Sequence, residues 1–316
     1  MIRRLLFITT AVVAAAQTPS PQMNVPSLGY VFDGNTKAIR LISGVPGAAS
    51  LDHLVSTNAT SLDSGFVHSG SRVAIANTKE GSVVLVQWSA TPQITKLTTS
   101  LVRVTQVAFS LAGDRAAITD GSVVEVWSGL SDSPARAATF TPDNGVTALA
   151  INPDGLAAAA TGAGAMVLLS DQPRQIAAGG KWTSLAFLPN GTDLLAADAA
   201  AQNLTLIRDV LTDAAASVVL SLHQEPDAVA VSADGSRAAL ASPGTLTIVS
   251  LADGTTTSIS CSCQAARFDR LAGNLVLHLT DSQSGSELLL DADSAQARVM
   301  SLSSVNSAAV NGVTAQ

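Results

Sequence analysis

The sequence predicts an all-β protein, a seven-bladed β-propeller whose blades are four-stranded antiparallel sheets. Three observations predict this fold. A unit of apolar run, turn closed by Gly and second apolar run recurs about every forty residues. The apolar residues come in short runs without a sustained helical period. The two ends of the chain carry complementary fragments of the unit. A repeat of this length is typical of stacked or radial sheets, most often of propellers.

Six glycines mark the turn inside the repeat. They stand at intervals of 43, 42, 36, 44 and 38 residues: Gly70, Gly113, Gly155, Gly191, Gly235 and Gly273. The clearest copies of the unit are residues 104–115 and 227–237. Pro, Asp and Asn precede several of these glycines, and such residues suit tight turns. Each glycine is therefore expected between the first and second strands of a blade.

Each unit divides into four expected strands. The first strands are apolar at consecutive positions, which is typical of strands buried on both faces. They cover residues 107–109, 149–151, 185–187 and 229–231. Second strands are expected at 116–118, 194–196 and 238–240, and third strands at 123–127, 167–169, 204–207 and 246–249. The fourth strand is more variable, for example at 255–259, as expected for an exposed outer strand.

The ends of the chain supply the seventh blade. Residues 29–33 and 38–42 resemble a second and a third strand with no first strand before them. Residues 305–312 resemble a first strand and its turn with nothing after them. We therefore expect the C-terminal strand to pair into the N-terminal blade as its innermost strand, because an open ring would expose strand edges. Deletion of residues 304–316 should then cause a large loss of thermal stability.

The N-terminal residues predict export. Residues 1–16 combine Arg3 and Arg4, an apolar stretch of eleven residues and the small-residue signal Ala14-Ala15-Ala16, as in a signal peptide. An uncleaved N-terminal anchor is the alternative. Residues 17–26 read as a Pro-rich linker and residues 27–316 as the propeller domain. The mature protein is expected to be periplasmic or secreted and monomeric, with no stable membrane insertion.

Composition narrows the choice of partners. Apolar residues make up 47% of the chain, charged residues 13%, and the net charge is −7. Only four Lys are present, so the clustered basic residues of a nucleic-acid binder are missing. We therefore expect no nucleic-acid partner.

The repeat resembles that of a known group of proteins. Residues 226–237, Pro-Asp-Ala-Val-Ala-Val-Ser-Ala-Asp-Gly-Ser-Arg, are similar to the signature of YVTN-type and WD40-like bacterial β-propellers. The similarity covers roughly residues 27–316. No Gly-His pair opens the repeats and no Trp-Asp pair ends them, although Trp88 and Trp127 stand where the WD40 Trp would fall. The hydrogen-bond network of WD40 repeats therefore cannot be carried over.

Acidic residues are the candidate ligand groups. In propellers, ligands usually meet the loops that join the second strand to the third and the fourth strand to the next blade. Candidates in or near these loops are Glu80, Asp120, Asp171, Asp198, Glu225, Asp227 and Asp281. A ring of carboxylates could hold Ca²⁺ through oxygen ligands. The alternative, which we favour, is that these acids form turns, because Asp suits turns by capping nearby backbone N–H groups.

Cys261 and Cys263 are the only cysteines, and they stand in one expected loop, Ser260-Cys-Ser-Cys263. In an oxidising compartment they are expected to form a disulfide or to remain inert thiols. A soft-metal role would need further ligands, and no His lies near. His278 stands in an apolar run and is expected to be a hydrogen-bonded core residue. The Gly162-Ala-Gly164 segment is not a dinucleotide fingerprint, because no helix is expected after it.

Two function hypotheses follow. The first is an exported, non-enzymatic propeller that binds a protein, peptide or glycan on its loop face without a cofactor. The absence of recognisable catalytic motifs favours it. The second is a metal-dependent hydrolase resembling lactonases, with carboxylates at the channel mouth. Only the acidic loops and the YVTN-like repeat favour this alternative.

Overall fold

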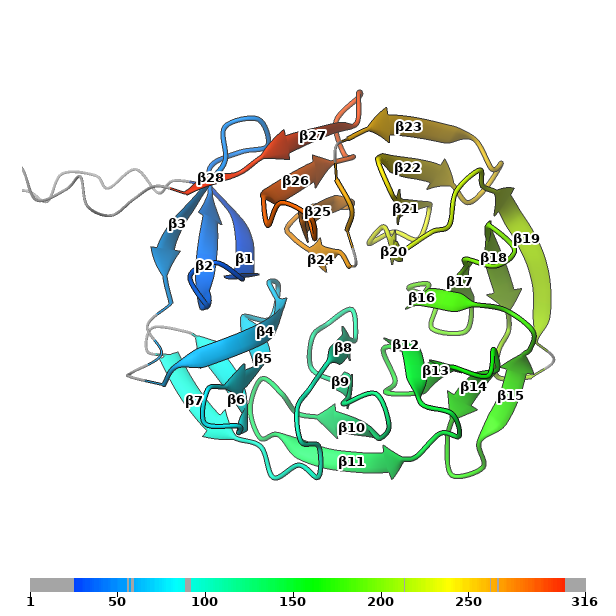
Figure 1. Ribbon diagram of the computed structural model, residues 1–316, viewed down its shortest axis with the longest axis horizontal. Helices are drawn as coiled ribbons and strands as arrows, with labels where there is room; N and C mark the ends of the chain where they lie inside the picture. The colour runs from blue at the N-terminus through cyan, green and yellow to red at the C-terminus, as the bar shows by residue number, and fades with distance from the viewer. Residues whose placement is uncertain are drawn as a thin grey trace, which may run out of the picture.

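The computed structural model describes residues 26–55, 57, 60–88, 92–212, 214–261, 263–265 and 267–304. Their strands form seven four-stranded sheets around a central axis, which confirms the predicted fold class (Figure 1). None of the described residues belongs to a helix long and apolar enough to cross a membrane. The expected signal peptide and residues 17–25 of the expected linker lie outside the described residues.

The strands are numbered in chain order. Blade 1 contains β1 (Ser27–Asp33), β2 (Ala38–Ser43), β3 (Ser50–Leu54) and β28 (Ser303–Ser304). Blade 2 contains β4 (Leu62–His68), β5 (Val73–Thr78), β6 (Val83–Trp88) and β7 (Pro92–Lys96). Blade 3 contains β8 (Gln106–Phe109), β9 (Ala116–Thr119), β10 (Val124–Ser128) and β11 (Ala135–Phe140). Blade 4 contains β12 (Val146–Ile151), β13 (Ala157–Thr161), β14 (Met166–Leu169) and β15 (Arg174–Ala177).

Blade 5 contains β16 (Trp182–Phe187), β17 (Leu194–Asp198), β18 (Asn203–Arg208) and β19 (Ala215–Ser221). Blade 6 contains β20 (Ala228–Val231), β21 (Arg237–Ser242), β22 (Thr245–Ser250) and β23 (Thr256–Ser260). Blade 7 contains β24 (Asp269–Arg270), β25 (Val276–Thr280), β26 (Glu287–Asp291) and β27 (Arg298–Ser301). In blades 2 to 7 the first strand lies nearest the axis and the fourth lies on the rim (Figure 1).

Burial follows the position of a strand within its blade. The second strands β9, β13 and β17 are buried at every residue, and the outer strand β19 is mostly exposed. The first strands are less enclosed than their apolar sequence predicts. Every residue of β8 is only half-buried, because β8 also borders the central channel. The expectation that first strands are buried on both faces is therefore wrong for β8.

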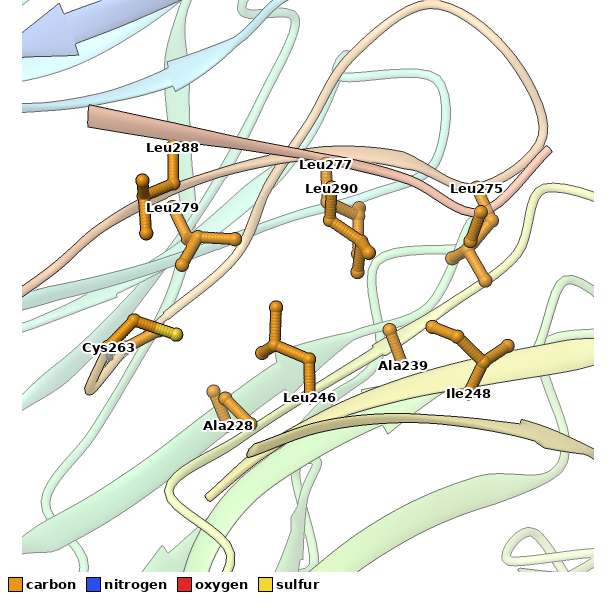
Figure 2. Close-up of a cluster of buried hydrophobic side chains, with 13 residues drawn as sticks. Ala228, Ala239, Leu246, Ile248, Cys263, Leu275, Leu277, Leu279, Leu288 and Leu290 are labelled. Carbon is orange, nitrogen blue, oxygen red and sulfur yellow. The ribbon is translucent and has the colours of Figure 1, made fainter. Parts of the chain in front are cut away.

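Apolar layers between neighbouring blades form the core. Between blades 6 and 7, Leu277 and Leu290 point toward Leu246 and Ala239 of the facing sheet (Figure 2). Leu277 and Leu290 are fully buried. Burial of one such side chain contributes roughly 1.5–3 kcal/mol. Six further clusters of buried apolar residues occur among the described residues, so each blade is held by its neighbours.

The ring is closed at blade 1, where a C-terminal strand pairs into the N-terminal blade as predicted. The C-terminal strand β28 pairs into the N-terminal blade, parallel to β3, at the end of the sheet opposite β1. β28 is thus the outermost strand of blade 1, and it is not the segment that the sequence predicts to be innermost. The reason is chain length: β27 ends on the rim at Ser301, and one residue separates it from β28. Residues 305–312, expected to form that inner strand, lie outside the described residues.

The inner edge of β1 is capped by a side chain. The Tyr30 N–H donates to Ser69 Oγ at 2.8 Å, and the Ser69 hydroxyl donates to the Tyr30 carbonyl at 2.6 Å. Ser69 comes from the turn after β4, so a side chain of blade 2 pairs with both backbone polar groups of Tyr30. A side chain at Gly29 would meet Ser69 Oγ at 2.7 Å, which explains the glycine there.

Candidate functional site

In each blade, one connection joins the second strand to the third, and another joins the fourth strand to the next blade. We call the end of the propeller that carries both kinds of connection the loop face. On this face a hollow of about 570 Å³ opens at the channel mouth. It is lined by Gly162–Gly164 of blade 4, Gly179–Thr183 leading into blade 5, Asp227 before β20, and Gln264 and Ser282 of blade 7. Loops from four consecutive blades thus converge on one site.

The hollow is continuous with the central channel. Thr147 and Thr183 line both the hollow and a cavity of about 600 Å³ between the inner strands. A ligand group bound at the mouth could therefore extend toward the axis of the ring.

One wall of the hollow is fixed by close packing. A Cβ at Gly180 would lie 2.3 Å from Trp182 Cε2, so only glycine fits there. The Trp182 indole N–H donates to the Gly164 carbonyl at 3.1 Å. Gly164 has φ +79°, a left-handed conformation that favours glycine. The wall is therefore formed by the fold before any ligand binds.

Asp227 is the acidic residue that lines the hollow. One of its carboxylate oxygens, Oδ2, is enclosed and has no hydrogen-bond partner among the described residues. Burial raises the pKa of Asp227, and the nearby Glu225 carboxylate adds to this effect. A hydrogen bond with Gln264 and the charge of Lys181 act in the opposite direction. Lys181 itself pairs with Glu225 at 2.9 Å in an exposed ion pair.

Asp198 and Asp281 lie beside the hollow, but turn backbone engages their carboxylates. Asp198 Oδ1 accepts bonds from the N–H groups of Lys181 and Ala200 at 3.0 and 2.9 Å. Asp281 accepts bonds from the N–H groups of Gln264 and Ser284 at 2.9 and 3.0 Å. Hydrogen bonds from Ser284 and Gln264 lower the pKa of Asp281 to about 2. Both acids thus shape the loops that carry lining residues.

The structure does not bring the remaining predicted acids to this site. Glu80 follows β5 and Asp120 follows β9, on the loop face, but neither lines the hollow. The Asp120 carboxylate accepts bonds from the N–H groups of Ser122 and Val123. Asp171 lies between β14 and β15, at the opposite end of its blade. Within the described ranges, no three His, Cys, Asp or Glu side chains gather closely enough to hold a metal ion.

Cys261 and Cys263 are joined by a disulfide, with 5.2 Å between their Cα atoms. The Cys261 N–H donates to the Gly244 carbonyl, and the Gly244 N–H donates to the Cys263 carbonyl. The Cys263 side chain is buried in the layer between blades 6 and 7 (Figure 2). This short bridge braces the connection that presents Gln264 to the hollow.

Several residues of the hollow carry no motif that sequence reasoning could single out. Blades 4 to 7 must pack side by side before these residues become neighbours: the glycines at 162, 164, 179 and 180, Gln264 and Ser282. The available signal was the clustering of Gly in two connections of adjacent blades. That signal indicates a close backbone approach but does not say to what.

Comparison with known protein families gives no match to any family model. A search of curated proteins finds no match either. The YVTN-type and WD40-like resemblance is thus supported at the level of a seven-bladed propeller, and membership of a particular family stays a prediction.

Proposed function

We propose that this chain is an exported β-propeller that binds a protein, peptide or glycan partner on its loop face and performs no catalysis. The hollow at the channel mouth is the observation that carries this proposal. Its volume lies in the range of ligand sites, and such sites are usually preformed, with a few polar groups that fix orientation. Asp227, Gln264 and Ser282 are the polar groups. The glycines that line the hollow have no side chain to keep a ligand away from their backbone.

The proposed role needs no cofactor. The carboxylates of Asp120, Asp198 and Asp281 accept hydrogen bonds from their own turns, and nothing in their placement favours a metal-dependent hydrolase. The disulfide supports the export that the leader predicts, because such bonds persist in oxidising compartments.

The test is to fill the hollow from its rim. Ser282 is exposed and lines the hollow, so Ser282→Trp places an indole there. Ser133→Trp is the matched control, at a serine that is also exposed and lies between β10 and β11 at the opposite end of its blade. Both variants and the unaltered mature protein are immobilised and exposed to an extract of the cell envelope.

The bound proteins and glycans are then quantified by mass spectrometry. We expect at least one species whose recovery falls at least about tenfold with Ser282→Trp and not with Ser133→Trp. A tenfold loss of affinity corresponds to about 1.4 kcal/mol of binding free energy. Matching melting temperatures of the two variants would show that both fold. Recovery that is independent of the Ser282 substitution for every species would contradict the proposal.

A further inference from the structure

The central channel is lined by one ring of equivalent positions. The last residue of each inner strand from blade 2 to blade 7 contributes to the channel wall: His68, Phe109, Ile151, Phe187, Val231 and Arg270. The equivalence rests on the backbone. In five of these blades the next residue donates its N–H to a carbonyl at or just before the second strand, as Leu188 does to Asp193 and Leu271 does to Val276. One cation therefore stands in a level that is otherwise apolar or aromatic.

The channel concentrates the phenylalanines of a chain that has few aromatic residues. Aromatic residues are 3% of the sequence, with 7 Phe in all. Four of them line this one cavity: Phe66, Phe109, Phe187 and Phe268. Each is half-buried instead of fully enclosed. Their rings thus keep surface that faces the cavity of about 600 Å³.

Among the described charged residues of the channel, one arginine has no ion-pair partner. Arg267 pairs with Asp269 at 3.4 Å, donates to the Gly65 carbonyl, and lies over the Phe66 ring at 4.6 Å. Arg270 forms no ion pair within the part of the chain that the structure describes. Its one side-chain hydrogen bond there is long, 3.4 Å from Nη1 to the Asn274 carbonyl. The other N–H groups of the Arg270 fork remain available.

The two acids that attract Arg270 accept hydrogen bonds from other groups. Asp234 and Asp293 attract the guanidinium, but burial still lowers the pKa of Arg270. Asp234 accepts bonds from the Ser236 N–H and hydroxyl, and Asp293 accepts bonds from the N–H groups of Asn274 and Leu275. Arginine stays protonated in proteins, so the charge persists.

His68, beside Arg270 in the ring, does not supply a counter-charge. Burial lowers the pKa of His68, and the positive charge of Arg270 lowers it further. Its Nδ1 accepts a bond from the Ser71 N–H at 3.2 Å. The imidazole is therefore neutral near pH 7, and the channel lining is net positive in a protein of net charge −7.

We propose that the channel binds an organic carboxylate with an apolar or aromatic body. The Arg270 fork receives the carboxylate in a bidentate pair, which matches the planar geometry of both groups. Phe109 and Phe187, at the same level of the ring, pack against the body of the ligand. A low-dielectric wall strengthens the attraction between the two charges. Arg270 lines the channel and not the hollow on the loop face with which the channel is continuous, and the binding proposed here does not depend on the partner proposed there.

Calorimetric titration of the mature protein with 4-phenylbutyrate and with its neutral amide, 4-phenylbutyramide, tests the site. The two probes share one apolar body and differ in the charged group. We expect the acid to bind at least about tenfold more tightly than the amide, a difference of about 1.4 kcal/mol. In Arg270→Gln this preference should disappear while the weak binding of the amide remains.

Two further variants sharpen the result. Arg208→Gln removes an exposed guanidinium at the end of β18 and should leave both affinities unchanged. Arg270→Lys keeps the charge but loses the fork, so it should retain only part of the preference. Equal binding of acid and amide by the unaltered protein, binding of neither probe, or an unchanged preference in Arg270→Gln would each overturn the proposal. The comparison of acid with amide needs no variant and stands even if one fails to fold.

Discussion

Individual buried charges in this propeller are neutralised inside single blades. Glu125 on β10 is fully buried and accepts bonds from Thr99, Ser100, Trp127 and Arg136. Burial alone would raise the pKa of Glu125, but these bonds hold it below its usual value. A buried charge is tolerated when it is paired and hydrogen-bonded in this way. Thr99 and Ser100 of the connection before β8 and Arg136 of β11 thus hold the Glu125 carboxylate inside blade 3.

His278 is the clearest case for a pH effect. Its Nε2 lies 2.7 Å from Glu287 Oε2 and its Nδ1 lies 3.2 Å from Asp269 Oδ2, so both ring nitrogens face carboxylates. Burial alone would lower the pKa of His278, but Asp269 and Glu287 together raise it above its ordinary value of about 6.5. Arg267, which pairs with Asp269, is the other charged group at this cluster. The folded protein therefore binds this proton more tightly than the unfolded chain.

The direction of the pH effect follows from that difference. The stabilisation is fully present below the pKa of the unfolded histidine and is lost as the pH rises through the higher folded value. We expect the free energy of unfolding to fall as the pH rises above about 6.5, with a slope of up to about 1.4 kcal/mol per pH unit. Urea unfolding at several pH values measures it. His278→Gln should flatten the dependence, and an equally steep curve in that variant would show that another group is responsible.

At the scale of strands and turns, aspartates at the ends of second strands accept backbone hydrogen bonds from two neighbouring connections. Asp198 closes β17, and its Oδ1 binds the N–H groups of Ala200 and Lys181, which belong to two different connections of blade 5. Asp281 does the same in blade 7 through Gln264 and Ser284. The Asp33 carboxylate caps the turn after β1 in a similar way. This similarity agrees with the prediction that β1 has the character of a second strand.

Asp198→Ala tests this role. The change leaves three part-buried N–H groups without their acceptor, so a loss of about 1–3 kcal/mol in the free energy of unfolding is expected. Asp198→Asn keeps an acceptor oxygen and should cost less. Asp171→Ala, on the exposed turn between β14 and β15, is the control and should be close to neutral. Urea denaturation compares the three variants, and similar losses for Asp198→Ala and Asp171→Ala would argue against the role.

The strands and turns could be predicted because their causes are local. Gly113, Gly155, Gly191, Gly235 and Gly273 all have positive φ, as turn glycines should. Gly70 differs, because in its turn the residue with positive φ is Arg72. The residues of the hollow and the channel could be predicted less well from the sequence. Asp227 was a candidate. The absence of an ion pair at Arg270 among the described residues and the position of four Phe around one cavity depend on the geometry of the ring, which the spacing of residues along the chain does not predict.

At the scale of the whole molecule, the last described residues link the two ends of the ring. Leu302 lies 9% exposed in a cluster with Leu28, Val31 and Ile42 of blade 1 and Leu289 of blade 7. Its N–H donates to the Glu287 carbonyl at 2.8 Å. Ser303 and Ser304 pair with Ser50 and Leu51 of β3. One apolar side chain and two paired residues thus connect blade 7 to blade 1.

Two truncations separate this closure from the one that the sequence predicts. A chain that ends at Ser301 loses Leu302 and β28, and removal of a buried leucine side chain alone costs about 2–5 kcal/mol. A chain that ends at Ser304 keeps both, so it should unfold at a higher urea concentration than the shorter chain by a free energy of at least about 2 kcal/mol. If residues 305–312 also form an inner strand, the chain ending at Ser304 will itself be less stable than the full chain. Equal stability of both truncations would show that Leu302 and β28 do not hold the ring closed, because their removal would then cost nothing.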